Sequence, residues 1–188
     1  MAELKSKRWY DEVRAACSFD FLADKDGEKL AEVAVLIESA AAYYLDALVD
    51  AEKHLLVVGK LEQMKAENSG LGYFYSGFFT DAQQIRIHLE MIRDEYKSKL
   101  YVWFTTSDDA KAEYGKLSAT EVKNLVEAEE MICVLEDLIR LMANRMHVLE
   151  NVKEGFVSRG IDLGKIIDGR VAGIEEVWID GTRETVNA

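Results

Sequence analysis

The longest regular pattern of apolar positions in the chain runs from Ser118 to Arg159. Apolar residues recur there at intervals of three and four, which is the spacing of one face of an α-helix. This face comprises Val122, Leu125, Val126, Met131, Ile132, Leu135, Leu138, Ile139, Met142, Met146, Leu149, Val152 and Phe156. Roughly forty residues at about 1.5 Å each make a helix about 60 Å long. Such a helix cannot lie wholly inside a compact chain of 188 residues, so the pattern predicts that a partner shares its apolar face.

Both ends of this helix carry recognisable signals. Ser118 and Glu121 have the spacing of a capping box, in which each side chain satisfies an unpaired backbone amide at the helix start. Gly160 follows the apolar run, and glycine readily adopts the left-handed conformation that closes a helix. We therefore expect a helix from 118 to about 159, then a short basic helix up to Arg170 and a polar tail after Gly181.

A second apolar stripe predicts a long helix from Leu30 to about Glu67. The turn-forming run Asn68-Ser-Gly-Leu-Gly72 is expected to end it. Five aromatic residues follow between Tyr73 and Phe79. We interpret this stretch as a core plug or a contact between subunits. The alternative, a base-stacking platform, lacks basic neighbours.

A third helix is predicted from Thr80, which forms a second capping-box pair with Gln83, to about Phe104. The chain then divides into three regions: an N-terminal arm and long helix (1–67), an aromatic loop with a basic helix and connection (68–117), and the long C-terminal helix with a short basic helix and tail (118–188). The fold class is all-α, with long antiparallel helices in a hairpin or coiled-coil arrangement, short terminal helices and an oligomeric state. The absence of proline fits a chain that is nearly all helix.

Charge and cysteine content narrow the functional classes. The net charge is -12, which argues against a protein that coats nucleic acid with its whole surface but allows a local basic site. Cys17 and Cys133 match no disulfide or metal pattern and suit a reducing compartment, with buried thiols. The N-terminus lacks the apolar core of a signal peptide, and no apolar run is long enough to span a bilayer. We expect a soluble cytoplasmic protein.

Cations alternate with aromatic residues in two places. Near the N-terminus, Lys5, Lys7, Arg8 and Arg14 accompany four aromatic residues, which indicates either a helix docked on the core or an arm that touches a neighbour or nucleic acid. In the third helix the candidate DNA-binding residues are Arg86, Arg93, Lys97, Lys99, Tyr101 and Trp103, with Tyr96 as a further stacking candidate. Lys97 and Lys99 lie about 200° apart around a helix, so they form a continuous track only if subunits repeat in a ring.

No catalytic constellation is found. His54, His88 and His147 lack the Glu-x-x-His pairing of a di-metal bundle. The glycines do not follow the order of a phosphate-binding loop, and no serine stands in a nucleophile elbow. We predict a protein that is not an enzyme, with no metal and no cofactor.

Three stretches carry a resemblance to a known family. They are Lys97-Ser-Lys99-Leu100, Tyr114-Gly-Lys116-Leu-Ser118 and Ser158-Arg159-Gly160-Ile-Asp-Leu163-Gly-Lys165-Ile166-Ile-Asp168-Gly-Arg170. The Ser-Arg-Gly sequence before a short helix is the most distinctive. On these motifs, the chain from Arg93 to Gly173 resembles the UvsY family of recombination mediators from T-even-type phages.

The resemblance implies an all-helical, ring-like homo-oligomer that binds single-stranded DNA. It further implies that the protein helps to load a RecA-like recombinase while displacing single-strand binding protein, in the cytoplasm of a phage-infected bacterium. Lys97 and Lys99 correspond to the DNA-binding lysine and arginine of the family. Lysine at 99 keeps the charge but lacks the planar fork of arginine. The net charge of -12 also differs from the basic family member.

Oligomerisation is assigned to apolar residues of the C-terminal helices, namely Leu138, Met142, Leu149, Val152, Phe156, Ile161 and Ile166. The first hypothesis is therefore a DNA-binding mediator. The second is an acidic, helical inhibitor or interaction protein that mimics DNA and presents the carboxylates between Glu121 and Asp137 to a basic partner. The third is a structural coiled-coil scaffold.

Overall fold

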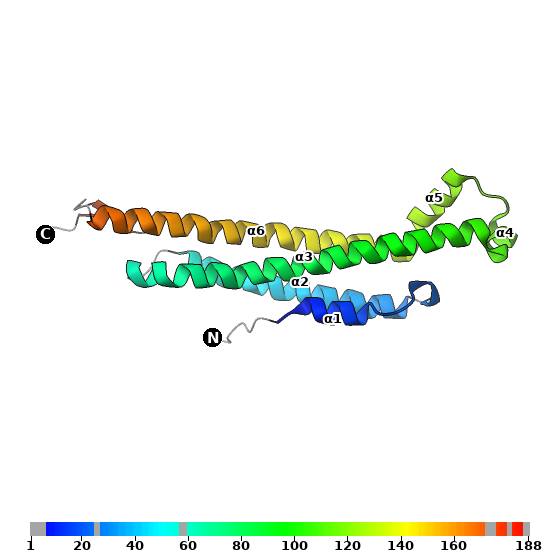
Figure 1. Ribbon diagram of the computed structural model, residues 1–188, viewed down its shortest axis with the longest axis horizontal. Helices are drawn as coiled ribbons and strands as arrows, with labels where there is room; N and C mark the ends of the chain where they lie inside the picture. Colours follow the sequence, from blue (N-terminus) through cyan, green and yellow to red (C-terminus); the bar gives the residue numbers. More distant parts are fainter. Residues whose placement is uncertain (1–6, 25–26, 57–59, 172–175, 180–181, 186–188) are drawn as a thin grey trace. The chain divides into compact units, whose positions relative to one another are not determined.

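The computed structural model describes residues 7–24, 27–56, 60–171, 176–179 and 182–185. The elements follow one another along the chain as α1 (Trp9–Ala16), the 3-10 helix η1 (Phe21–Ala23), α2 (Glu28–Leu55), α3 (Leu61–Thr106), α4 (Asp108–Tyr114), α5 (Ala119–Ala128), α6 (Glu130–Val171), β1 (Glu176–Ile179) and β2 (Thr182–Thr185) (Figure 1). The predicted helical class is confirmed, with a short β-hairpin added near the C-terminus.

The chain forms two compact units, each assembled from separate segments. Unit 1 contains Tyr43–Thr80 and Met146–Ala188, and unit 2 contains Lys7–Ala42 and Asp81–Arg145. The helices α2, α3 and α6 contribute residues to both. The units therefore do not coincide with the consecutive regions 1–67, 68–117 and 118–188.

In unit 2, an aspartate side chain fixes the start of α1. The carboxylate of Asp81 on α3 accepts hydrogen bonds from the backbone amides of Trp9 and Tyr10, at 2.9 and 3.2 Å. These first-turn amides have no partner within their own helix, so Asp81 holds the start of α1 on the core. The expected docking of the N-terminal aromatic and basic segment is thus observed for α1, whose Trp9 and Val13 are buried. Lys5 lies outside the described residues.

Unit 1 is organised around aromatic side chains. The ring of Tyr75 on α3 stacks on that of Phe156 on α6, with centroids 5.2 Å apart and planes 10° from parallel. The Tyr75 hydroxyl donates to Asp50 Oδ2 on α2 at 2.9 Å, which satisfies a polar group inside the core. Phe78 lies 2% exposed beside Tyr75. The core-plug interpretation of the aromatic stretch is correct for these side chains.

The break expected between Asn68 and Gly72 is wrong, because α3 continues through it. A Cβ on Gly72 would lie 3.4 Å from the Cβ of Phe156, so this glycine provides close contact with α6 rather than a turn. The second capping box is also wrong. Thr80 lies inside the helix, where its hydroxyl donates to the carbonyl of Ser76 at 3.1 Å.

The long C-terminal helix begins as predicted but is divided differently. The amide of Glu121 donates to Ser118 Oγ at 3.3 Å and the amide of Ser118 to Glu121 Oε2 at 2.7 Å, which confirms the capping box. The chain then becomes extended at Glu129 (φ -63°, ψ 128°), where α5 ends and α6 starts. Gly160 does not end the helix, because α6 continues to Val171.

Two short strands follow α6. β1 pairs with β2 in antiparallel register, from Glu176 opposite Thr185 to Ile179 opposite Thr182. The sequence pattern predicted a polar tail after Gly181 and no strand on either side of it, so this hairpin was not predicted.

Candidate nucleic-acid interface

All four cations predicted to contact DNA lie on the part of α3 that belongs to unit 2. Because successive residues of an α-helix are about 100° apart, Lys97 and Lys99 point in different directions. Lys97 reaches Glu136 on α6, whereas Lys99 reaches Asp20, in the segment that precedes α2. The helix therefore separates the two lysines, as the spacing predicted.

The ion pair of Lys97 is the tighter one. Its Nζ lies 2.7 Å from Glu136 Oε1, and the two side chains are 28% and 41% exposed. The hydrogen bond from Lys97 lowers the pKa of Glu136, against a smaller opposing effect of desolvation, and nearby positive charges including Arg93 act in the same direction. Lys97 is thus held by a carboxylate that stays ionised at neutral pH.

Lys99 is held by more exposed groups. Its Nζ lies 2.9 Å from Glu95 Oε1 and 3.7 Å from Asp20 Oδ1. The side chains are 44% exposed for Lys99, 68% for Glu95 and 59% for Asp20. The hydrogen bond to Glu95 raises the pKa of Lys99. Exposed pairs of this kind are screened by water and contribute little to stability, so water or another anion can replace them at little cost.

The two arginines also have carboxylate partners. Arg93 Nη2 lies 2.7 Å from Asp94 Oδ1, and Arg86 Nε lies 2.9 Å from Glu90 Oε1. Each predicted DNA-binding cation is therefore already neutralised within unit 2. Sequence reasoning identified the cations but not these partners, because two of the carboxylates, Asp20 and Glu136, come from distant parts of the chain.

The candidate stacking residues differ in exposure. Tyr101 is 42% exposed, and Trp103 is half-buried with its ring edge-on to Phe104 at 4.9 Å. Tyr96 is buried, its hydroxyl donates to Met131 Sδ at 3.4 Å, and burial raises its pKa to about 12. Tyr101 is therefore the side chain that a base can reach, and Tyr96 belongs to the core.

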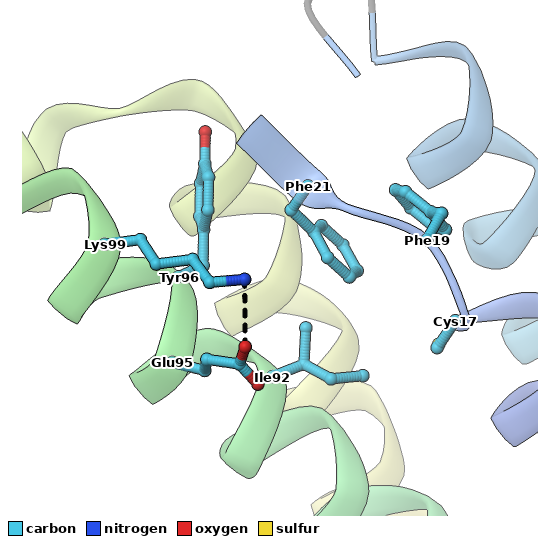
Figure 2. A pocket seen from close by; sticks show the side chains of 7 residues that line it. All are labelled: Cys17, Phe19, Phe21, Ile92, Glu95, Tyr96 and Lys99. Carbon is cyan, nitrogen blue, oxygen red and sulfur yellow. Dashed lines mark ion pairs between the residues drawn. The ribbon is translucent and has the colours of Figure 1, made fainter. Parts of the chain in front are cut away.

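A small cavity of about 70 Å³ lies beside Lys99, lined by Cys17, Phe19, Phe21, Ile92, Glu95, Tyr96 and Lys99. Figure 2 shows the ion pair between Lys99 and Glu95 among these side chains. Burial raises the pKa of the Cys17 thiol to about 11, so it is protonated and unreactive at neutral pH. A space of this size accommodates a few water molecules. Cys133, in contrast to the expectation of buried thiols, is exposed.

The residues predicted to form the oligomer contact are mostly inside the chain. Five of them are no more than 7% exposed: Leu138, Met142, Leu149, Val152 and Phe156. Ile166 packs against Leu61, Met64 and Leu163, and Ile161 is the exception at 55% exposed. The apolar face of α6 is therefore covered by the protein's own helices, and the prediction that it faces another subunit does not hold for these five.

The Ser-Arg-Gly motif has a packing role that the sequence did not reveal. The guanidinium of Arg159 donates from Nη1 to Asn68 Oδ1 at 2.8 Å, and Asn68 Nδ2 donates to the carbonyl of Phe156 at 2.9 Å. Arg159 and Asn68 are 9% and 8% exposed. A Cβ on Gly160 would lie only 2.9 Å from Asn68 Nδ2. The motif thus forms a buried polar contact between α3 and α6 in unit 1.

The described residues contain neither a cluster of metal ligands nor a membrane-spanning helix. Among the described residues, no three His, Cys, Asp or Glu side chains are grouped to hold a metal ion. His54 Nε2 lies 3.7 Å from Asp50 Oδ2, while burial, reinforced by the positive charge of Arg14, lowers the pKa of His88. No helix in the described part of the chain is long and apolar enough to cross a membrane.

Comparison with known proteins adds no assignment to this geometry. No protein-family model, curated protein or solved structure matches the chain significantly.

Proposed function

We propose that the protein is a non-catalytic recombination mediator that binds single-stranded DNA. It would help a RecA-like recombinase to load onto strands covered by single-strand binding protein, in the cytoplasm of a phage-infected bacterium. The resemblance of residues 93–173 to the UvsY family supports this reading. The observation that carries it is the exposed Lys99 on α3, which is held only by exposed carboxylates, together with the exposed Tyr101, which lies one helical turn after Lys97.

Binding would proceed by exchange of anions. A DNA phosphate replaces Glu95 and Asp20 at Lys99. Tyr101 lies about 200° from Lys99 around the helix and one turn after Lys97, so a base stacked on Tyr101 belongs with a phosphate at Lys97. Because exposed ion pairs are weak, the exchange costs little at Lys99, whereas Lys97 must first leave its tighter partner Glu136. Lys99 therefore contributes more than Lys97. Release of counterions makes the affinity fall as salt rises.

The proposal includes an antiparallel arrangement of α3 and α6 and a homo-oligomer. In unit 1, Met64 near the start of α3 packs with Leu163, and Tyr75 further along packs with Phe156, so rising numbers on α3 meet falling numbers on α6. Self-association would place several weak sites on one strand, which raises the overall affinity without new contacts.

The test is fluorescence anisotropy of labelled oligo-dT and a matched duplex, at low and moderate salt. Lys99→Ala should weaken binding to oligo-dT by about tenfold, and Lys97→Ala by less. Lys123→Ala on α5 is the matched control, because it removes the same charge from an exposed helix position and should change affinity little.

A gain of affinity gives a sharper test of the exchange. Glu95→Gln removes the nearer of the two carboxylates that hold Lys99 and leaves Asp20 at 3.7 Å, and Glu136→Gln removes the carboxylate that holds Lys97. Both variants should therefore bind oligo-dT more tightly than the wild type. Glu38→Gln on α2 changes the net charge equally and controls for long-range repulsion. If all three glutamine variants gain the same affinity, the effect comes from net charge, and the assignment of Lys97 and Lys99 is wrong.

The alternative is an acidic helical interaction protein that never contacts DNA. It is favoured by the carboxylate partners of all four candidate cations and by the net charge of -12. Absence of oligo-dT binding at low salt, for the wild type and for both Glu95→Gln and Glu136→Gln, would reject the mediator and favour this alternative.

A further inference from the structure

The stretch from Asn68 to Thr80 is unusual in this chain because it carries no charged residue, although 31% of the chain is charged. The structure makes it a continuous part of α3 in unit 1. A helix surface without charges is expected where it is covered by other residues. Only one side of this stretch is covered by the chain itself.

The aromatic side chains of the stretch divide between the two sides. Tyr75 and Phe78 are 1% and 2% exposed and belong to the core, and Phe74 is half-buried with its ring edge-on to both. Tyr73 is 85% exposed, the highest value among the large apolar side chains described as exposed. Tyr73 thus lies on solvent, away from the contacts that explain its neighbours.

The exposed side of the stretch has a regular composition. Its positions alternate in steps of three and four residues, all are exposed, and none is charged: Gln63, Ala66, Gly70, Tyr73, Gly77 and Thr80. This is the spacing of a coiled-coil seam, in which large side chains of one helix enter gaps on another. We name these six residues the Tyr73 face.

The Tyr73 face contains both a projection and gaps that match it. Gly70 and Gly77 lie one turn before and one turn after Tyr73, and a Cβ at either would meet no atom within 4 Å. The two glycines therefore leave open depressions on either side of the projecting ring. Glycine destabilises a helix interior by about 0.5–1 kcal/mol relative to alanine, so these glycines weaken α3 without any packing reason inside the chain.

We propose that the Tyr73 face is the contact between two copies of this chain, with the Tyr73 ring of each copy seated over a glycine of the other. A two-fold contact uses the same patch on both partners, so the patch must be complementary to itself. The Tyr73 face meets that requirement, since it holds both the projection and its gaps.

The lack of charged residues on the Tyr73 face favours a second copy of this chain over a nucleic acid or a basic protein as its partner. Two chains of net charge -12 repel each other, and contact is least costly where neither presents a carboxylate. The stretch from Asn68 to Thr80 provides such a surface. A nucleic acid requires cations, and a basic protein partner would be attracted to carboxylates, neither of which this face supplies.

The size of the face sets the expected strength. From Gln63 to Thr80 the helix is about 26 Å long. That is short for a standard interface of roughly 800 Å² per partner, so this contact alone belongs with weak, transient interfaces. Close approach over glycine improves the packing of each ring, and an aromatic side chain buries about 150–250 Å². We expect dimerisation in the micromolar range, visible as a mass that rises with concentration.

The experiment is sedimentation equilibrium of the full chain without DNA. Gly77→Gln fills one depression and should raise the dimer dissociation constant at least about tenfold, yet it should also raise the melting temperature because glutamine is the better helix former. Gly164→Gln on α6 is the control: a Cβ there also meets no atom within 4 Å, although the residue is half-buried where Gly77 is exposed, so the variant should gain stability and leave association unchanged.

A second pair of variants removes the projection. Tyr73→Ala should give a monomer, whereas Val157→Ala, at a position 59% exposed on α6, should dimerise as the wild type does. A wild-type protein that stays monomeric throughout, or a dimer whose dissociation constant is unaffected by Tyr73→Ala and Gly77→Gln, would overturn the proposal. The inference rests on the proposed self-association alone. Its failure would leave the DNA site on α3 untouched, because the measurement contains no DNA.

Discussion

At the scale of single residues, Gly160 provides the clearest prediction. In Gly160→Ala, the new Cβ would lie 2.9 Å from Asn68 Nδ2, which is too close, so the Asn68 side chain must move. This movement would break the hydrogen bonds that Asn68 makes with Arg159 and with the carbonyl of Phe156. Loss of buried hydrogen bonds costs about 1–3 kcal/mol, which exceeds the gain of about 1 kcal/mol in helix propensity. The free energy of unfolding should fall by about 1 kcal/mol in urea denaturation.

Gly164 is again the control, since Gly164→Ala adds a methyl group to open space and should stabilise the protein by about 0.5–1 kcal/mol. Equal stabilisation by both alanine variants would mean that Asn68 can move at no cost. The hydrogen bonds between Asn68, Arg159 and Phe156 would then contribute nothing measurable to stability.

These two glycines also show what the sequence alone cannot predict about a single residue, namely which side chain of another helix approaches it. Gly160 was interpreted as a helix stop because glycine adopts left-handed conformations easily, but the fold uses its lack of a side chain. The pattern of one helix contains no information on the side chain that approaches from another. The same holds for Lys97 and Glu136, whose pairing depends on how α3 and α6 pack.

At the scale of elements, the start of α5 is the feature that both sequence and structure support. Ser118→Ala removes the acceptor of the Glu121 amide, and loss of an N-cap costs about 1 kcal/mol. Thermal unfolding should show a lower midpoint. Thr80→Ala is the informative comparison, because Thr80 lies within α3 and its loss should have a smaller effect. A similar drop for both would contradict the assignment of Ser118 as the cap.

The helices themselves could be predicted because periodicity reports which face is apolar. Val122, Leu135, Met142, Leu149 and Phe156 were all placed on one face, and all are at most 2% exposed. Periodicity does not state what covers the face: the prediction shared it with a partner, and the structure buries these five side chains within the chain itself. Where α5 gives way to α6 at Glu129, the named apolar positions skip from Val126 to Met131, an interval of five. The intervals of three and four resume at once, so the pattern as a whole still predicts one helix.

At the scale of the whole molecule, self-association and DNA binding should be coupled through the strand. If each chain offers one weak site around Lys99, a dimer holds a long strand at two points, and the second contact is made at high effective concentration. A short strand reaches one site only. Gly77→Gln should therefore bind long oligo-dT less tightly than the wild type, by about tenfold or more, while binding a short oligo-dT equally well.

The comparison separates the two proposals. Glu95→Gln should increase affinity for both strand lengths, since it acts at the site itself, whereas Gly77→Gln should affect only the long strand. Anisotropy titrations of both variants on both strands, at protein concentrations where the wild type is dimeric, supply the test. Equal losses on long and short strands would show that Gly77 affects the DNA site directly, and an unchanged affinity for the long strand would show that each chain binds DNA independently of its neighbour.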